Sequence, residues 1–154
     1  MKKYFEAKLN NKEVTDTLER YAKEVGDLKP ALRIARRALL NAIDENFETE
    51  GESSGDKFEG WSDAYTEWRE KHKHGDGKIM NLEGDLRKSM SSKITRNELI
   101  IGTAKEYAAA HNFGYAPRNL KQREIMRISE EVKENILNDI AYDLAKRIAS
   151  RTKG

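Results

Sequence analysis

The sequence predicts an α+β fold with a helical hairpin at its start, a small antiparallel β-hairpin or sheet in its middle and a long helix at its end. Apolar residues recur every three or four positions in residues 12–47 and again in residues 129–150, which is the spacing of amphipathic helices. Residues 89–103 instead contain two short segments separated by a turn, as in a β-hairpin. The length of 154 residues fits one domain, divided into the hairpin (12–47), a mixed α/β middle (58–128) and the last helix.

Two apolar stripes predict the helical hairpin. The first stripe consists of Val14, Leu18, Tyr21, Val25 and Leu28, and the second of Leu32, Ala35, Leu39, Ile43 and Phe47. Gly26 can take the left-handed conformation that ends a helix, and Pro30 is tolerated in the first turn of the next one. The two helices should therefore be joined by a tight turn near residue 26.

Residues 48–60 contain three glycines and two serines among many charged residues, so we expect a mobile loop there. Trp61, Tyr65 and Trp68 follow at i, i+4 and i+7, which places them on one face of a short helix with Ser62 or Asp63 near its cap. An aromatic stripe at this spacing usually belongs to a core. Because tryptophan is also a common interface anchor, an interface is the second interpretation.

The strands are predicted at residues 89–95 and 98–103, with Arg96 and Asn97 as the turn between them. The alanine-rich residues 107–112 should form a helix that ends within residues 113–117. Residues 125–128 are apolar but indicate no particular element. Ser129 caps the last helix, whose apolar stripe is Val132, Ile136, Ile140, Leu144 and Ile148.

Composition excludes several classes of protein. The chain has no cysteine, so it has neither disulfides nor thiolate metal sites. It has no apolar run of the roughly 20 residues that span a bilayer, and residues 1–9 lack the apolar segment of a signal peptide. Charged residues make up 36% of the chain and nearly cancel, at +2, which indicates solvated helix faces. With 37% apolar residues, the chain should form thin elements with large exposed faces. This suits a protein that assembles with copies of itself or with partners.

Residues with catalytic potential do not form a recognisable site. His72, His74 and Asp76 lie in one loop without further ligands nearby in the sequence, so a solvated turn is favoured over a metal site. His111 is expected to be a partly buried, hydrogen-bonded histidine. The chain has no G-x-S-x-G motif, and residues 75–78 lack the spacing of a phosphate-binding loop. We therefore predict no enzyme activity, no cofactor and no metal.

Two clusters of basic residues leave a nucleic-acid alternative open. They are Arg33, Arg36 and Arg37, and Arg118, Lys121 and Arg123. Acidic neighbours dilute both clusters and no stacking aromatics are interleaved with them, so a solvated or polar interface face is favoured. The alternative is an accessory protein that binds nucleic acid through the first cluster.

The middle of the chain carries an ordered set of features. They are Phe58-x-x-Trp61, Thr66, Ile79-Met80, Gly84-x-Leu86, Ser89-Met90, Ile101-Gly102-Thr103, Tyr107-Ala108-x-x-His111-Asn112-Phe113-Gly114, and Arg123 within residues 122–129. This order and spacing resembles the phage virion morphogenesis family, which includes tail completion proteins of contractile-tailed phages of the Mu and P2 types. The resemblance covers residues 14–145. It departs from the family pattern at Glu83, Ala110, Lys121 and Arg127.

The resemblance implies a non-enzymatic protein that completes the tail at its head-proximal end so that tail and head can join. It implies a ring of identical subunits in contact with tail tube and head–neck proteins, found in the virion and, during assembly, in the host cytoplasm, with neither membrane nor nucleic acid as a partner. We expect Tyr107 and Phe113 in the core, Gly114 in a turn, and loops 48–60 and 115–122 free to order on a neighbour. The structural and interface candidates are Trp61, Tyr65, Trp68, Gly84, Leu86, Gly102, Tyr107, His111, Phe113, Gly114 and Arg123.

Overall fold

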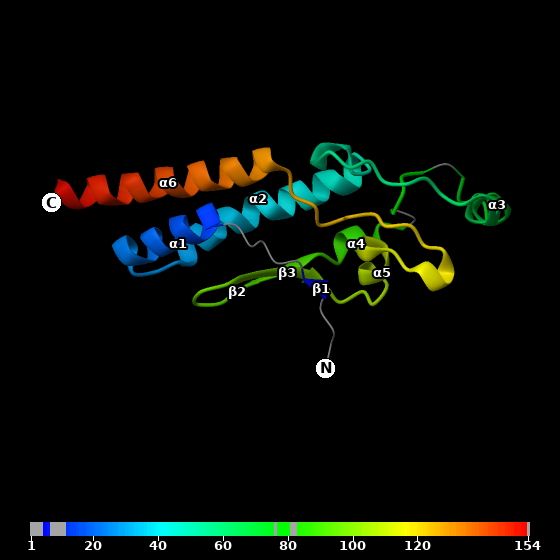
Figure 1. The fold of residues 1–154 in the computed structure, drawn as a ribbon, viewed down its shortest axis with the longest axis horizontal. Coiled ribbons are helices and arrows are strands. Elements are labelled where there is room, and N and C mark those ends of the chain that lie inside the picture. The colour runs from blue at the N-terminus through cyan, green and yellow to red at the C-terminus, as the bar shows by residue number, and fades with distance from the viewer. Residues whose placement is uncertain (1–4, 7–11, 76, 81–82, 154) are drawn as a thin grey trace.

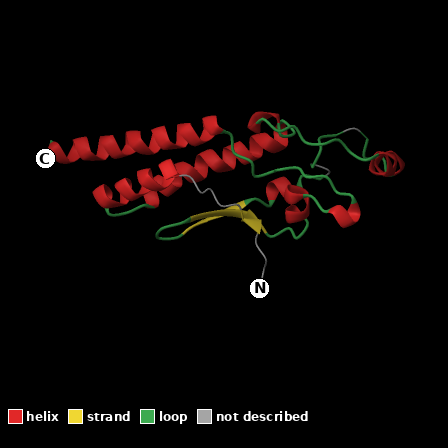
Figure 2. Cartoon of the chain, viewed as in Figure 1, coloured by secondary structure: helices red, strands yellow, loops and turns green. Residues whose placement is uncertain are grey.

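A computed structural model describes residues 5–6, 12–75, 77–80 and 83–153, and it confirms the α+β class. Three long helices lie side by side in one layer: α1 (Lys12–Val25), α2 (Lys29–Glu48) and α6 (Glu130–Thr152). A small sheet and the short helices α4 (Asp85–Lys88) and α5 (Ala108–Phe113) lie below α2, and α3 (Asp63–Lys71) stands at one end of the elongated molecule (Figure 1). Figure 2 shows how little of the chain is strand.

The helical layer confirms the predicted hairpin and its apolar stripes. Gly26, with φ +78°, ends α1 as expected. The inner faces of α1, α2 and α6 share one core of buried residues: Tyr21, Ala31, Ile136, Ile140 and Leu144. The hydroxyl of Ser129 accepts a hydrogen bond from the Val132 amide at 3.3 Å, so the predicted cap begins α6. The helix α6 packs against both α1 and α2, so it joins the two arms of the hairpin.

The sheet has three antiparallel strands in the order β1-β3-β2. They are β1 (Phe5–Glu6), β2 (Ser91–Ile94) and β3 (Leu99–Thr103). The hairpin of β2 and β3 is where the sequence predicted it, although β2 is shorter, and Ser91 lies opposite Gly102. The strand β1 was not predicted. It pairs Phe5 with Thr103, so β3 is the central strand.

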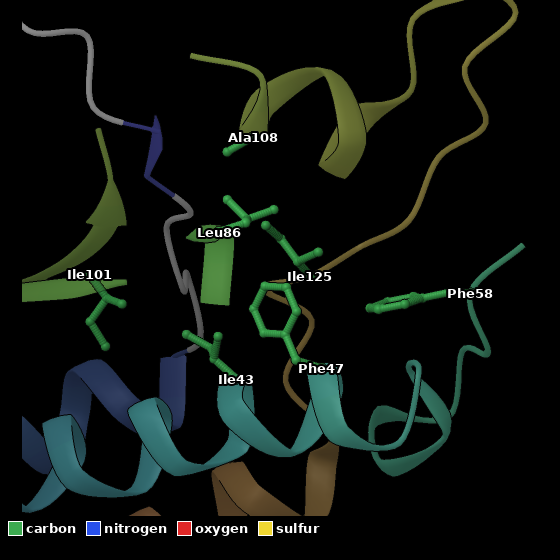
Figure 3. Close-up of a cluster of buried hydrophobic side chains, with 7 residues drawn as sticks. All are labelled: Ile43, Phe47, Phe58, Leu86, Ile101, Ala108 and Ile125. Atoms are coloured by element: carbon green, nitrogen blue, oxygen red, sulfur yellow. The ribbon is translucent and has the colours of Figure 1, made fainter. Parts of the chain in front are cut away.

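A second core lies between α2 and the sheet layer (Figure 3). Its buried residues are Ile43, Phe47, Phe58, Leu86, Ile101, Ala108 and Ile125, and Figure 3 shows the Phe47 ring extending from α2 toward Leu86 and Ile125. The apolar segment 125–128, for which the sequence indicated no particular element, is irregular. The helix α2 binds this segment through Asn46. The Asn46 amide nitrogen donates to the Ile125 carbonyl at 3.3 Å and to the Arg127 carbonyl at 2.8 Å. These bonds satisfy a polar group that is fully buried.

Residues 48–60 are folded against the body, so the expectation of a mobile loop is wrong. They include a short 3₁₀ helix, η1 (Glu52–Ser54), and place Phe58 in the second core. Gly51 is buried with φ +90°, and a Cβ there would lie 2.1 Å from the carbonyl oxygen of Asp56. The turn therefore depends on a residue without a side chain.

An ion-pair cluster joins α2 to α4 on the outside of this core. Arg87 binds both carboxylate oxygens of Asp44, with Nε–Oδ1 2.6 Å and Nη2–Oδ2 2.8 Å, and it reaches Glu48 Oε2 at 2.8 Å. Lys78 also pairs with Glu48. The Arg87 bonds lower the pKa of Asp44 below its ordinary value.

Within the described residues, no helix has the length and apolar character needed to cross a membrane.

Candidate functional site

A cavity of about 500 Å³ lies between α3, α4, α5 and residues 118–123. It brings together seven of the eleven candidates predicted from the sequence: Trp61, Tyr65, Gly84, Leu86, Tyr107, His111 and Arg123. The other four are elsewhere: Trp68 on α3, Gly102 buried in β3, Phe113 at the end of α5, and Gly114 directly after it. The elements that form the cavity are those at the α3 end of the molecule in Figure 1.

The aromatic stripe of α3 is an exposed stack of rings, not part of a core. Tyr65 and Trp68 are 37% and 39% exposed. Their rings stack with centroids 5.6 Å apart, and Trp61 meets Tyr65 edge-on at 5.9 Å. The core interpretation is therefore wrong. Helical spacing put the rings on one face, but among the described residues no other helix or strand buries that face, and the rings cover one another.

Arg69 was not singled out from the sequence, although it lines the cavity and is only 4% exposed. Its Nε donates to the Gly75 carbonyl at 3.1 Å and its Nη2 to the His74 carbonyl at 3.2 Å. Its guanidinium carbon lies 4.1 Å from the centre of the Trp61 ring. One buried arginine thus folds the loop after α3 back onto the helix. Because charged residues are common throughout the sequence, the position of Arg69 directly after Trp68 did not indicate that its side chain is buried.

The histidines of that loop stack on Trp68. The ring centroids of His72 and His74 lie 4.5 Å and 5.3 Å from that of Trp68. Asp76, the third residue of the possible metal cluster, lies outside the described residues. Among the residues described, no group of three metal-ligating side chains is close enough to hold an ion. Both histidine rings therefore pack against Trp68 within the protein.

Arg123 ties the two sides of the cavity together. Its side chain is 8% exposed, and Nε and Nη2 donate to the carbonyls of Glu59 and Gly60, each at 2.8 Å. Burial lowers the pKa of Arg123, and the Glu59 carboxylate acts in the opposite direction. Lys121 pairs with that carboxylate at 3.3 Å. Two members of the second basic cluster are therefore engaged within the chain.

His111 is partly buried beside Arg123, as expected, but it lacks the hydrogen bond we predicted. Its Nδ1 is the one buried side-chain polar atom without a partner among the described residues. Its ring meets Tyr107 edge-on at 6.0 Å, and its carbonyl accepts from the Arg123 amide at 2.7 Å. Burial, helped by the charge of Arg123, lowers the pKa of His111. The ring is therefore neutral at pH 7.

Tyr107 and Phe113 are 46% and 62% exposed, so their predicted place in the core is wrong. The helix α5 buries Ala108 and Asn112, which share one face at i and i+4. Tyr107 and Phe113 each lie one residue outside this pair and therefore flank the buried face.

Gly114 forms the predicted turn. Its φ is +75°, and a Cβ would lie 3.2 Å from both the Leu120 oxygen and the Gln122 nitrogen. Residues 115–120 form a closed loop instead of a free one, because the backbones of Tyr115 and Leu120 hydrogen-bond to each other. The short 3₁₀ helix η2 (Ala116–Arg118) lies within this loop. The loop therefore has a shape of its own, although its side chains are exposed.

Exposed aromatic residues concentrate at this end of the molecule. Six large apolar or aromatic side chains are exposed among the described residues, and five belong to α3, to α5 or to the residues directly before and after α5: Tyr65, Trp68, Tyr107, Phe113 and Tyr115. The sixth, Tyr142, lies on α6. Clusters of exposed aromatics are typical of protein–protein contact surfaces. The site thus has the chemistry of a docking surface.

Comparison with known proteins identifies a family for the chain, and the match includes the middle region. The model of the phage virion morphogenesis family matches residues 9–145. The chain is 35% identical over 86 residues to the putative capsid assembly protein G of Escherichia phage Mu, a match that covers 55% of each chain. It is 28% identical over 141 residues to the Mu-like prophage FluMu G protein 2 of Haemophilus influenzae, covering 88% of this chain and 92% of that one. The chain thus spans about half the length of the Mu protein. No solved structure matches.

Proposed function

The chain belongs to the phage virion morphogenesis family, a family of phage assembly proteins, and from this premise we propose that it completes the phage tail at its head-proximal end. In this role it makes the tail competent to join the filled head, by protein–protein contacts and without catalysis. It acts in the host cytoplasm during assembly and stays in the virion, as a ring of identical subunits between tail tube and head–neck proteins. The likeness to a prophage protein along most of its length supports a phage or prophage origin.

The observation that carries the proposal is the concentration of exposed aromatic side chains at the end of the molecule that holds α3 and α5, where Tyr65 and Tyr107 line the cavity. Tyr107 and Tyr115 are each 46% exposed, although they flank segments that are well packed. Exposed aromatic side chains are favourable in a protein whose surface is covered after assembly, because large rings anchor interfaces at low entropic cost. A protein that only fills space in a particle would not need them.

A ring also requires two different surfaces on each subunit. Figure 1 shows that the outer side of α6 and the α3 end face different directions. Each can therefore contact a different neighbour, whether another copy of this chain or another protein of the particle.

Deletion of the gene from its phage or prophage, followed by electron microscopy of the lysate, tests the proposal. We expect filled heads and tails of normal length that remain separate, and purified protein added to the lysate should restore joining and infectivity. Loss of head assembly would instead assign a capsid role, which is the role that the name of the Mu relative, putative capsid assembly protein G, describes. Normal joined particles would refute any assembly role at this step.

A surface variant makes the test specific. Tyr107→Ala combined with Tyr115→Ala should fold as the wild type does, because both side chains are half exposed, yet it should fail to restore joining. Lys93→Ala is the control, since Lys93 is exposed on β2, away from the cavity. Equal rescue by both variants would show that the aromatic surface has no part in the function.

The nucleic-acid alternative has a distinct signature. Arg33 and Arg37 are exposed on α2, while Arg36 is half-buried. Binding through these residues would fall steeply with salt and would be lost on their replacement by alanine. Rescue of joining by that triple variant would exclude this surface from the function.

A further inference from the structure

Tyr142 is the most exposed large side chain of apolar character among the described residues, at 72%. It lies on α6 two residues after the buried Ile140, which places it about 200° around the helix and thus on the opposite face. Its ring therefore extends away from the three-helix layer. A ring left this exposed, and apart from the aromatic end of the molecule, is typical of an interface anchor.

The surface around Tyr142 is acidic toward the start of α6. Asp139 lies one turn before Tyr142, and Glu131 and Glu134 are exposed further back along the helix, whereas the exposed Lys146 lies one turn after Tyr142. On the side of Tyr142 toward the start of α6, this face therefore combines one aromatic ring with negative charge. A complementary surface would combine an aromatic-lined hollow with positive charge.

The cavity between α3 and α5 has both of these properties. Trp61, Tyr65 and Tyr107 supply aromatic walls. The basic residues that line it outnumber the acidic ones by four to two: Arg69, Arg118, Lys121 and Arg123 against Glu83 and Asp85. Arg69 and Arg123 are buried on backbone carbonyls and Lys121 pairs with Glu59, while Arg118 is exposed at the rim. Its volume of about 500 Å³ is ample for one aromatic side chain and lies within the range of pockets that hold small organic ligands.

We infer that Tyr142 of one copy of this chain enters the cavity of the next copy, with the acidic part of α6 against the basic rim formed by Arg118 and Lys121. The inference rests on the proposed ring of identical subunits. The contact joins two different surfaces, so its repetition builds a ring or an open row instead of a closed dimer. The cavity is then an acceptor site that is incomplete without the neighbour's Tyr142.

Cross-linking between copies tests this pairing directly, because the chain has no cysteine of its own. One copy carries Tyr142→Cys and the other Arg118→Cys, and the mixture is treated with a short bis-maleimide. Both positions are exposed, so neither change removes core packing. We expect the mixed pair to cross-link strongly, whereas Tyr142→Cys mixed with Lys93→Cys should stay near the background.

Equal yields for the two mixtures would overturn the inference. A dominant product of Tyr142→Cys with itself would also overturn it, because that product indicates a symmetric contact between two α6 helices. A wild-type chain that stays monomeric at every concentration would point to a different protein as occupant, and would refute the pairing of copies.

Association measured by sedimentation gives the energetic test. Tyr142→Ala should weaken self-association by about 30-fold or more, the effect of losing a central anchor. Tyr142→Phe is the matched control and should retain most of the affinity, since it keeps the ring that fills the cavity. Unchanged association of Tyr142→Ala would exclude the residue from the contact.

These outcomes are separable from those of the gene deletion. Unjoined heads and tails without the specific cross-link would leave the proposed function standing and refute this contact. A specific cross-link in a protein whose deletion leaves particles normal would do the reverse.

Discussion

The hydroxyl of Tyr21 on α1 donates a hydrogen bond to the carboxylate of Asp143 on α6, with 2.5 Å between the two oxygens. The Tyr21 ring is fully buried, and Asp143 also accepts from Arg147 Nε at 2.7 Å. Burial and the nearby Asp143 raise the pKa of Tyr21 to about 12. The hydrogen bond from Tyr21 is the main reason that the pKa of Asp143 lies below its ordinary value. The first and last helices are therefore joined by a polar contact at the edge of their shared core.

Tyr21→Phe should lower the free energy of unfolding by about 1–2 kcal/mol at pH 7, because it removes this bond and keeps the ring. The folded-state pKa of Asp143 is depressed, so the stabilisation is present above the ordinary value of 3.8 and is lost as the pH falls through the folded value. Urea unfolding of both proteins at pH 7 and near pH 2–3 measures the difference, which should shrink in acid. Tyr142→Phe is the control, and an equal loss in it would contradict this account.

Arg87 and Asp44 should show a coupling of about 1 kcal/mol in a double-mutant cycle built from Arg87→Met and Asp44→Asn. The Arg87 side chain is 26% exposed and that of Asp44 58%, which limits the coupling through solvent screening. Arg87→Lys should lose most of it, since lysine keeps the charge but cannot bind both carboxylate oxygens in a fork. Thermal unfolding with and without added salt provides the measurement. Full stability in the lysine variant would show that charge alone matters.

Gly51 and Gly55 form a matched pair for testing the turn after α2. Both have positive φ, so an alanine at either position should cost about 1 kcal/mol in backbone strain. Gly51→Ala should cost a further 1–3 kcal/mol or so, because its Cβ meets the Asp56 oxygen, whereas nothing lies within 4 Å of a Cβ at Gly55. Chemical denaturation of the two variants gives the difference. Equal losses would mean that residues 51–56 relax freely, as the sequence suggested.

His111→Leu should stabilise the protein by about 1 kcal/mol at pH 7, because it replaces a buried nitrogen that has no partner. The folded-state pKa of His111 is lowered, so the unfolded chain takes up a proton first as the pH falls below the ordinary value of 6.5. The wild type should therefore lose stability as the pH falls below about 6.5, and the leucine variant should lose less. Melting temperatures of both proteins, measured from pH 7 into weak acid, test it. Parallel curves for wild type and His111→Leu would refute the assignment.

The sequence predicted the long helices well because their periodicity records burial directly. The stripe through Ile136, Ile140 and Leu144 is the buried face of α6, and the caps at Gly26 and Ser129 are local. The strand β1 could not be found in the same way. It is two residues long, and it exists only because it pairs with residues 102–103, almost two thirds of the chain away in sequence.

The candidate site was predicted as a set of residues but not as an environment. Seven candidates meet at one cavity, yet the spacing of Trp61, Tyr65 and Trp68 could not show that no element covers them. Periodicity tells which residues share a face, and tertiary structure decides what that face meets. Phe58 illustrates the opposite case, since a side chain in a glycine-rich segment became part of the core because η1 turns the chain back onto α2.

The core that surrounds Tyr21 has a consequence for how the protein is made. Two of its walls, α1 and α2, leave the ribosome early, but the third, α6, is synthesised after everything it packs against. A nascent chain must therefore carry Tyr21 and Ala31 exposed to water until α6 has been synthesised, and only then can the helical layer close. A chain that ends after residue 128 should bind hydrophobic dyes and unfold without a cooperative transition. The full chain should bind no such dye and should unfold cooperatively. In the proposed assembly, such a delay would keep unfinished subunits out, since the outer face of α6 is displayed only on chains that have been synthesised through that helix.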